Sequence, residues 1–189
     1  EFIDIVPAQQ RVDEHWYTGT ADAVYQNLEL LHEAQPEFVL VLAGDHVYKM
    51  DYGVMLAEHV QRGADVTVAS LEVKLEDARR LGVLSINENG RVLRFDEKPE
   101  RPLPLPGRPG HALASMGVYV FGYQFLVDQL SRDAADATSS HDFGRDLLPW
   151  LVQHAHVAAH RFADNGVDMV GDQPYWRDVG TVDVYWEAN

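Results

Sequence analysis

Acidic residues that follow apolar or aromatic segments are the first candidates for chemistry in this sequence. Asp45 follows the apolar run 38–43 and a glycine, and Asp178 follows an aromatic pair at 175–176. A carboxylate at the carboxyl end of a buried strand can hold a Mg²⁺ ion that bridges phosphate oxygens. Each acid also has a simpler interpretation, because Asp45 could hydrogen-bond its own turn and Asp178 could cap a following helix. The sequence does not show whether the two acids pair.

Glu97-Lys98-Pro99 is a second candidate, at the end of a predicted strand over residues 91–96. Pro99 disfavours the helical conformation for Lys98 and so fixes how the chain leaves the strand. An ammonium group there could bind a phosphate, and the carboxylate of Glu97 could bind sugar hydroxyls. The alternative is a surface ion pair in front of a loop, which would contribute little to stability.

Three further residues are weaker candidates. Gly82 is interpreted as the residue that ends a short helix, and Ser115 as a small residue within a strand. Tyr17, next to Trp16, could stack on a base or a sugar, or could only anchor its loop.

Histidine and cysteine content limits the possible metal chemistry. The nine histidines show no metal-ligand spacing, so we expect structural or solvated roles for them. Surface positions are expected for His32, His59 and His111. The chain has no cysteine, which excludes disulfides and thiolate metal sites and suits a cytoplasmic protein.

Length and composition indicate one folded domain. The chain has 189 residues, of which 46% are hydrophobic, and this is enough to bury a core. A net charge of -15 argues against a general nucleic-acid binder, although a few cations and Mg²⁺ could still hold a small phosphorylated substrate. No apolar run approaches the roughly 20 residues of a membrane-spanning helix.

Helical and strand patterns alternate along the chain. Thr20 is predicted to cap a first helix, Asp51 and Gly63 to bound a second, and Asn89-Gly90 to form a hairpin turn. The predicted helices are 21–31, 52–62, 75–81, 124–130, 142–153 and 182–187, and the predicted strands are 38–43, 65–73, 82–87, 91–96, 114–121 and 157–162. This alternation predicts an α/β sandwich around a mostly parallel sheet with one hairpin, and no domain boundary within residues 1–189.

Seven segments occur in the order in which bacterial ADP-glucose pyrophosphorylases carry them, and the chain resembles this family over essentially its whole length. The segments are residues 7–11, 16–24, 42–52, 95–99, 114–121, 140–146 and 175–181. Strand-Gly-Asp and Glu-Lys-Pro are shared with sugar nucleotidyltransferases in general. More specific are Gly-Asp-His-Val-Tyr at 44–48, Ser-His-Asp-Phe-Gly at 140–144 and Tyr-Trp-Arg-Asp-Val-Gly at 175–180.

The resemblance implies a Rossmann-like nucleotidyltransferase domain that makes ADP-glucose and pyrophosphate from ATP and glucose 1-phosphate, for glycogen synthesis. It implies that Asp45 is catalytic and binds Mg²⁺, with Asp178 as the second metal ligand. Lys98 matches a catalytic lysine that grips the phosphate of glucose 1-phosphate. It also implies a cytoplasmic homotetramer as the complete protein.

Four substrate-binding positions are implied in the same way. Glu97 and Ser115 match residues on the sugar, while Tyr17 and Gly82 match contacts to ADP-glucose. Glu33 lies near the point where some members place an arginine for AMP, so inhibition by AMP is not expected to carry over.

The family's Gly-rich phosphate loop, first strand and C-terminal β-helix do not match any part of this sequence. We therefore expect a part of the catalytic domain that is inactive when isolated. Two alternatives stay open, namely a sugar nucleotidyltransferase that uses another nucleoside triphosphate and a non-catalytic regulatory subunit. The presence of both acids, Asp45 and Asp178, opposes the regulatory alternative.

Overall fold

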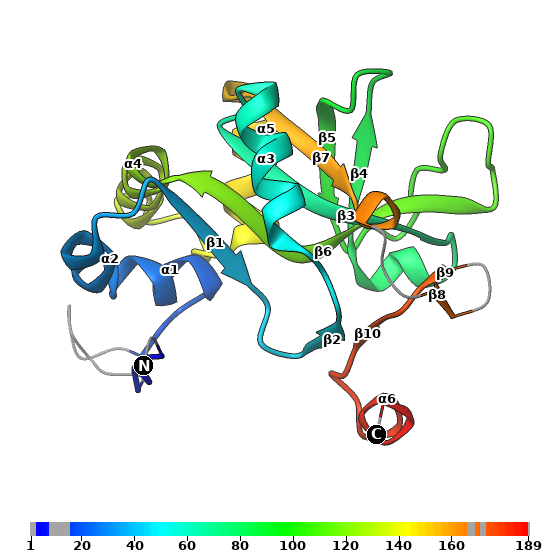
Figure 1. The fold of residues 1–189 in the computed structure, drawn as a ribbon, viewed down its shortest axis with the longest axis horizontal. Helices are drawn as coiled ribbons and strands as arrows, with labels where there is room; N and C mark the ends of the chain where they lie inside the picture. The colour runs from blue at the N-terminus through cyan, green and yellow to red at the C-terminus, as the bar shows by residue number, and fades with distance from the viewer. Residues whose placement is uncertain (1–2, 8–15, 166–168, 171–172, 189) are drawn as a thin grey trace.

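The computed structural model describes residues 3–7, 16–165, 169–170 and 173–188, and the motif at 7–11 falls largely outside them. Its centre is a six-stranded sheet (Figure 1). Five strands follow the order β5 (Val92–Glu97), β4 (Gly82–Ile86), β6 (His111–Gly122), β3 (Val66–Lys74) and β7 (Val157–Arg161). The sixth, β1 (Phe38–Leu42), pairs with the last part of β6.

The strands of this sheet are mostly antiparallel. The pairs β1–β6, β3–β6, β4–β5 and β4–β6 are antiparallel, and β3–β7 is parallel. The predicted α/β class is confirmed, but the prediction of a mostly parallel sheet is wrong. A continuous apolar run such as β1 indicates a strand that is apolar on both faces, and this property carries no information about the direction of the neighbouring strand.

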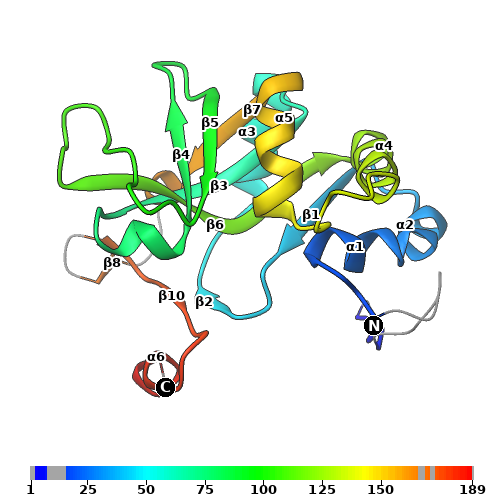
Figure 2. The ribbon, with the colours of Figure 1, turned by 180° about the vertical axis from the view of Figure 1, so that it is seen from behind.

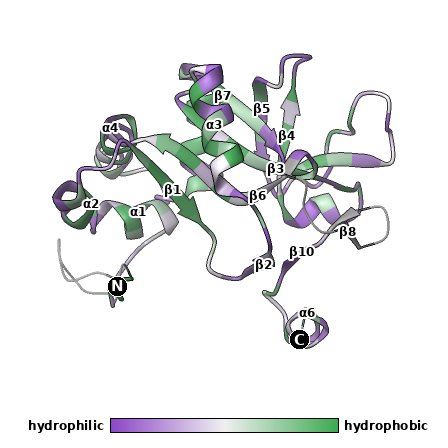
Figure 3. Ribbon diagram, viewed as in Figure 1, coloured by the Kyte–Doolittle hydropathy of each residue, from purple (hydrophilic) through white to green (hydrophobic). Residues whose placement is uncertain are grey.

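The central strand β6 contributes to two hydrophobic cores, because successive side chains point to opposite faces of a sheet. Tyr119 and Phe121 belong to one core, and Val118 and Val120 to the other. Helices α4 (Tyr123–Ala134) and α5 (Leu148–His154) contribute to the first core, and α3 (Tyr52–Arg62) contributes Met55 to the second. Figures 1 and 2, seen from opposite sides, show α3 on one face of the sheet and α5 on the other. Figure 3 shows the strand β1 as continuously hydrophobic.

Helix α3 has the predicted boundaries. Its first turn is capped by Asp51, whose side chain accepts a hydrogen bond from the backbone N–H of Gly53. Its end is Gly63, in the left-handed conformation with φ of 57°. Glycine adopts this conformation without a steric penalty, which is why it ends so many helices.

The predicted single helix 21–31 is instead two short helices, α1 (Thr20–Tyr25) and α2 (Leu28–Ala34). Asn27 lies between them, and its side-chain amide donates to the Ala23 carbonyl and to the Tyr17 hydroxyl. Such local hydrogen bonds compete with the helical backbone pattern. The predicted cap is also wrong, because Gly19 is the N-cap and the Thr20 hydroxyl donates to Asp142.

The remaining elements are short. A 3₁₀ turn, η1 (Asp77–Arg80), replaces the helix predicted over 75–81, and the helix predicted over 142–153 begins as a π-helical turn, η2 (Phe143–Leu147), before α5. The helix α6 (Val182–Glu187) has its predicted bounds. The unpredicted elements are β2 (His46–Tyr48), η3 (Phe162–Asn165), β8 (Met169–Val170), β9 (Gln173–Pro174) and β10 (Trp176–Asp178). No helix in the described residues is long and apolar enough to cross a membrane.

His59 was expected at the surface but is only 2% exposed. Its Nδ1 lies 2.8 Å from the Thr67 hydroxyl, and its ring meets Phe38 edge-on. Helix α3 presents this position to the sheet together with Met55, so the imidazole belongs to the core face. Burial lowers the pKa of His59 below its ordinary value of 6.5, with the charge of Asp65 opposing the shift.

We expect His59 to make the protein less stable in mild acid. Below about pH 6.5 the unfolded chain binds a proton at His59 that the folded chain does not, so the free energy of unfolding falls as the pH falls. His59→Gln removes this contribution, which is at most about 1.4 kcal/mol per pH unit for one proton. The measurement is chemical denaturation between pH 7.5 and 5.5. The variant should lose less stability than the wild type over this range, and the exposed control His32→Gln should behave like the wild type. Equal pH dependence in all three proteins would contradict the assignment.

Candidate active site

The turn that carries Asp45 is fixed to the central strand. Residues 43–45 connect β1 to β2, and the Ala43 N–H donates to the Gly117 carbonyl at 3.0 Å. The pairing of β3 with β6 is irregular here. Val68 pairs with Tyr119 and Ser70 with Ser115, so the single residue between them on β3 faces residues 116–118 on β6. A bulge of this kind redirects backbone groups, and bulges are common next to active sites.

Asp178 reaches the same place through a short antiparallel ladder. In this ladder β10 pairs with β2, and Asp178 lies directly opposite His46. Directly opposite residues of an antiparallel pair have side chains on one face, with Cβ atoms about 4.5–5.5 Å apart. The Val179 N–H also donates to the Asp45 carbonyl at 2.9 Å. Two acids that are far apart in sequence are therefore joined by backbone hydrogen bonds.

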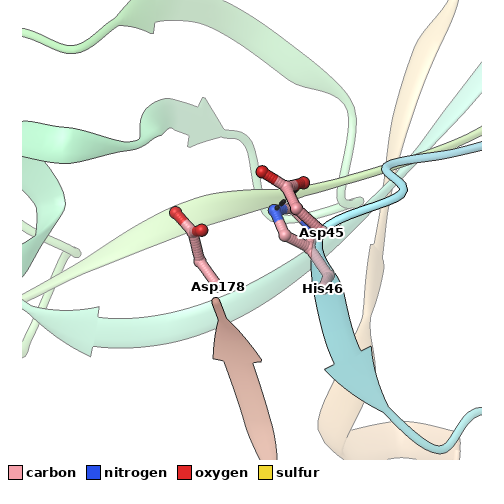
Figure 4. A group of neighbouring side chains, drawn as sticks. All are labelled: Asp45, His46 and Asp178. Atoms are coloured by element: carbon pink, nitrogen blue, oxygen red, sulfur yellow. Dashed lines mark ion pairs between the residues drawn. The ribbon is translucent and has the colours of Figure 1, made fainter. Parts of the chain in front are cut away.

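Asp45, His46 and Asp178 form a cluster in which one ligand atom of each lies within 4.8 Å of the others. Figure 4 shows the two carboxylates and the imidazole edge facing a common space. The Asp45 side chain is 64% exposed, so an ion can reach it from solvent. The alternative helix-capping role of Asp178 is wrong, because Thr181 caps α6 and the Asp178 carboxylate accepts from the Gly180 N–H.

The cluster lies beside a cleft of about 460 Å³ that Asp45 also lines. The walls come from α1, β1 and its following turn, β5, β6 and the start of η2. The lining residues are Thr20, Ala23, Val24, Val41, Leu42, Ala43, Gly44, Asp45, Glu97, Gly117, Tyr119, Asp142, Phe143 and Gly144. A mostly apolar cavity with a few convergent carboxylates is the usual form of a small-molecule site.

Glu97 is the predicted sugar-binding acid, and it lines this cleft from the end of β5. Burial raises the pKa of the Glu97 carboxyl, and the charge of Asp142 adds to the increase, while Lys98 opposes both. The Lys98 ammonium lies 3.5 Å from the Glu97 carboxylate and its side chain is 65% exposed. The Lys98 N–H donates to the Leu81 carbonyl, which holds the backbone in a left-handed conformation with φ of 46°.

The other predicted substrate residues lie at different depths. Ser115 is almost fully buried in β6, and its hydroxyl accepts from the Gly117 N–H at 3.2 Å. Tyr17 is half-buried, with its hydroxyl accepting from Asn27. Gly82 was interpreted as a helix end, but it begins β4 directly opposite Glu97. Of these three residues, none is among those that line the 460 Å³ cleft.

The structure adds cleft residues to which sequence reasoning gave no individual role. Asp142 lines the cleft, caps η2 by accepting from the Gly144 and Arg145 N–H groups, and accepts from the Thr20 hydroxyl. Tyr119 packs against Phe143 with ring centroids 5.5 Å apart. In the sequence, the motif at 140–144 contains Asp142 and Phe143, but it indicated only a resemblance and not a role for either residue.

Comparison with known proteins gives a family match over nearly the whole chain. The sequence profile of the nucleotidyl transferase family matches residues 2–189. Over the whole chain, the sequence is 57% identical to a glucose-1-phosphate adenylyltransferase of Nitrosospira multiformis, 59% to that of Methylobacillus flagellatus and 54% to that of Agrobacterium fabrum. The chain spans 44% of the length of the first two relatives and 46% of the third.

Gly82 leaves the space that Phe95 and Glu97 occupy, so we expect Gly82→Ala to be destabilising. An added Cβ would lie 2.4 Å from the Phe95 ring and 3.1 Å from a Glu97 carboxylate oxygen. Overpacking of this kind costs about 1–3 kcal/mol. The measurement is the free energy of unfolding by urea. The control Gly110→Ala, with nothing within 4 Å of its added Cβ, should change it far less. Equal effects of the two substitutions would show that the space at Gly82 does not matter.

Proposed function

This chain belongs to the nucleotidyl transferase family, and from that membership we propose that it is part of a glucose-1-phosphate adenylyltransferase. The proposed reaction joins ATP and glucose 1-phosphate to give ADP-glucose and pyrophosphate for glycogen synthesis. The single observation that carries the proposal is the pair Asp45 and Asp178, held together by β2 and β10 beside a cleft with Glu97 on its wall.

In the proposed reaction the protein must align two anionic substrates, ATP and glucose 1-phosphate. A phosphate oxygen of glucose 1-phosphate forms a bond to the α-phosphorus of ATP, and the bond to the bridging oxygen of pyrophosphate breaks with its electron pair. No covalent nucleophile on the protein is needed, so alignment and charge neutralisation are the main contributions of the protein. Asp45 and Asp178 would hold a Mg²⁺ ion, since carboxylate oxygens suit this ion. When bound, the ion supplies positive charge at the phosphate oxygens.

The remaining predicted residues would bind the sugar phosphate. We assign the Lys98 ammonium to the phosphate, and Glu97 and Ser115 to the sugar. The ion pair between Glu97 and Lys98 supports this division, because the half-buried carboxylate lines the cleft and the exposed ammonium lies 3.5 Å from it. Tyr17 is proposed to contact ADP-glucose directly. Gly82 is proposed to act by leaving room for Glu97.

A catalytic role is favoured over a regulatory one because both metal-binding acids are present and converge. ATP is favoured over other nucleoside triphosphates because the relatives named above are adenylyltransferases and are more than half identical to this chain. The resemblance alone carries the further proposal that the complete protein is a cytoplasmic homotetramer.

Asp45→Ala should lower kcat by at least about 100-fold and change KM much less. A cation held by Asp45 would neutralise charge that develops in the transition state, so loss of this ligand should affect turnover more than substrate affinity. The assay is ADP-glucose formation with Mg²⁺ by the complete protein. Glu88→Ala, which removes an exposed acid from the β4–β5 turn, is the control and should keep normal turnover. Unchanged kcat in Asp45→Ala would rule out the metal role.

Lys98→Ala should raise the KM for glucose 1-phosphate and leave that for ATP nearly unchanged. The lysine contacts the phosphate in the ground and transition states alike, so its loss removes uniform binding. A hydrogen bond to a charged group contributes about 1.5–3 kcal/mol, or roughly 10- to 150-fold in KM. Arg101→Ala removes another exposed cation of the same loop and should have little effect. Equal increases in both KM values would show that Lys98 acts elsewhere.

A further inference from the structure

The hydrogen bond from His46 to the central strand fixes which ring nitrogen carries a proton. His46 Nδ1 lies 2.7 Å from the Met116 carbonyl oxygen. A carbonyl oxygen can only accept, so Nδ1 must be the donor. In the neutral imidazole the other nitrogen, Nε2, then has a lone pair and no proton. A bond to a backbone carbonyl is one of the arrangements that orient metal-binding histidines in proteins.

Nε2 faces the acids of the cluster. It lies 3.6 Å from Oδ1 of Asp45, and His46 is directly opposite Asp178 in the β2–β10 ladder. In the neutral ring, Nε2 and the carboxylate oxygen are both acceptors, so their approach favours a bound metal ion or a proton on Nε2 between them. Figure 4 shows the imidazole nitrogen directed at the Asp45 carboxylate, with Asp178 on the far side of the same space.

The surroundings of the ring hold it in this orientation. The His46 side chain is only 12% exposed, and its ring meets Trp176 edge-on with centroids 5.0 Å apart. On the side of β6, Gly117 leaves room for the ring, because a Cβ there would lie 3.1 Å from Cε1 of His46. Gly117 also has φ of 66°, a conformation that favours glycine. The ring is therefore oriented before any ion arrives.

We propose that His46 is the third protein ligand of the metal ion held by Asp45 and Asp178, and binds it through Nε2. This inference rests on the metal pair of the proposed function. One imidazole and two carboxylates bind Co²⁺ better than an all-oxygen set does, while Mg²⁺ gains little from nitrogen. His46 therefore sets the metal preference of the site and favours later transition-metal ions such as Co²⁺ relative to Mg²⁺.

The first test compares metal affinities by calorimetry with Co²⁺ and Mg²⁺ added alone. His46→Phe keeps an aromatic ring against Trp176 and removes both nitrogens. We expect it to lower Co²⁺ affinity by about 10- to 100-fold and Mg²⁺ affinity by less than about 3-fold. His154→Ala, which removes an exposed histidine of α5, is the control and should change neither. Equal losses for the two ions would overturn the proposal and leave His46 a purely positioning role.

The second measurement needs no substitution and so does not depend on how the variant folds. Nitrogen NMR of the wild type with added Zn²⁺ should shift the His46 Nε2 resonance strongly and leave Nδ1 protonated. An unshifted Nε2 in a protein that binds Zn²⁺ at this cluster would overturn the proposal.

Asp178→Asn separates this inference from the proposed function. If Asp178→Asn lowers the affinity for both ions while His46→Phe changes neither affinity, the metal pair of Asp45 and Asp178 stands and the assignment of His46 as a third ligand is wrong. If Asp178→Asn also leaves both affinities unchanged, the metal pair itself is wrong and the inference about His46 fails with it.

Discussion

The site depends on an electrostatic constraint, because two carboxylates and an imidazole nitrogen are held within 4.8 Å of one another. Like charges and facing acceptors at this distance are unfavourable unless a metal ion or a proton on the imidazole offsets them. The backbone maintains the arrangement through the β2–β10 ladder and through the hydrogen bond between Val179 and Asp45. The stability of the rest of the domain therefore offsets the repulsion among these three side chains and keeps them close together.

The central strand β6 is what allows the domain to do this. Its alternating side chains fill two cores, and its irregular pairing with β3 frees the backbone near Gly117. The carbonyls of Met116 and Gly117 then accept from His46 and Ala43, which anchors the turn that carries Asp45. The same strand places Tyr119 on the cleft wall. The strand β6 thus both fills the hydrophobic cores and fixes the geometry of the site.

Local signals in the sequence predicted the elements that depend on local chemistry. Helix α3 is capped by Asp51 and ended by Gly63 as expected, and the β4–β5 hairpin turns at Gly90 with φ of 75°. The direction of the sheet strands was wrong because apolar runs do not encode it. Likewise, nothing local shows that His59 faces the core or that three residues of β2 pair with β10. Asp45 and Asp178 were candidates from their positions, and the resemblance implied their metal role, whereas their convergence with His46 in one cluster required the structure.

The central claim is that Asp45 and Asp178 bind one ion together, and a double-substitution cycle on Mn²⁺ affinity tests it most directly. Binding is followed by electron paramagnetic resonance for the wild type, Asp45→Asn, Asp178→Asn and the protein with both substitutions. A shared ion predicts strong non-additivity, with a coupling of at least about 1 kcal/mol, because either substitution alone already removes most of the site. Additive losses, or no loss from either substitution, would contradict the account.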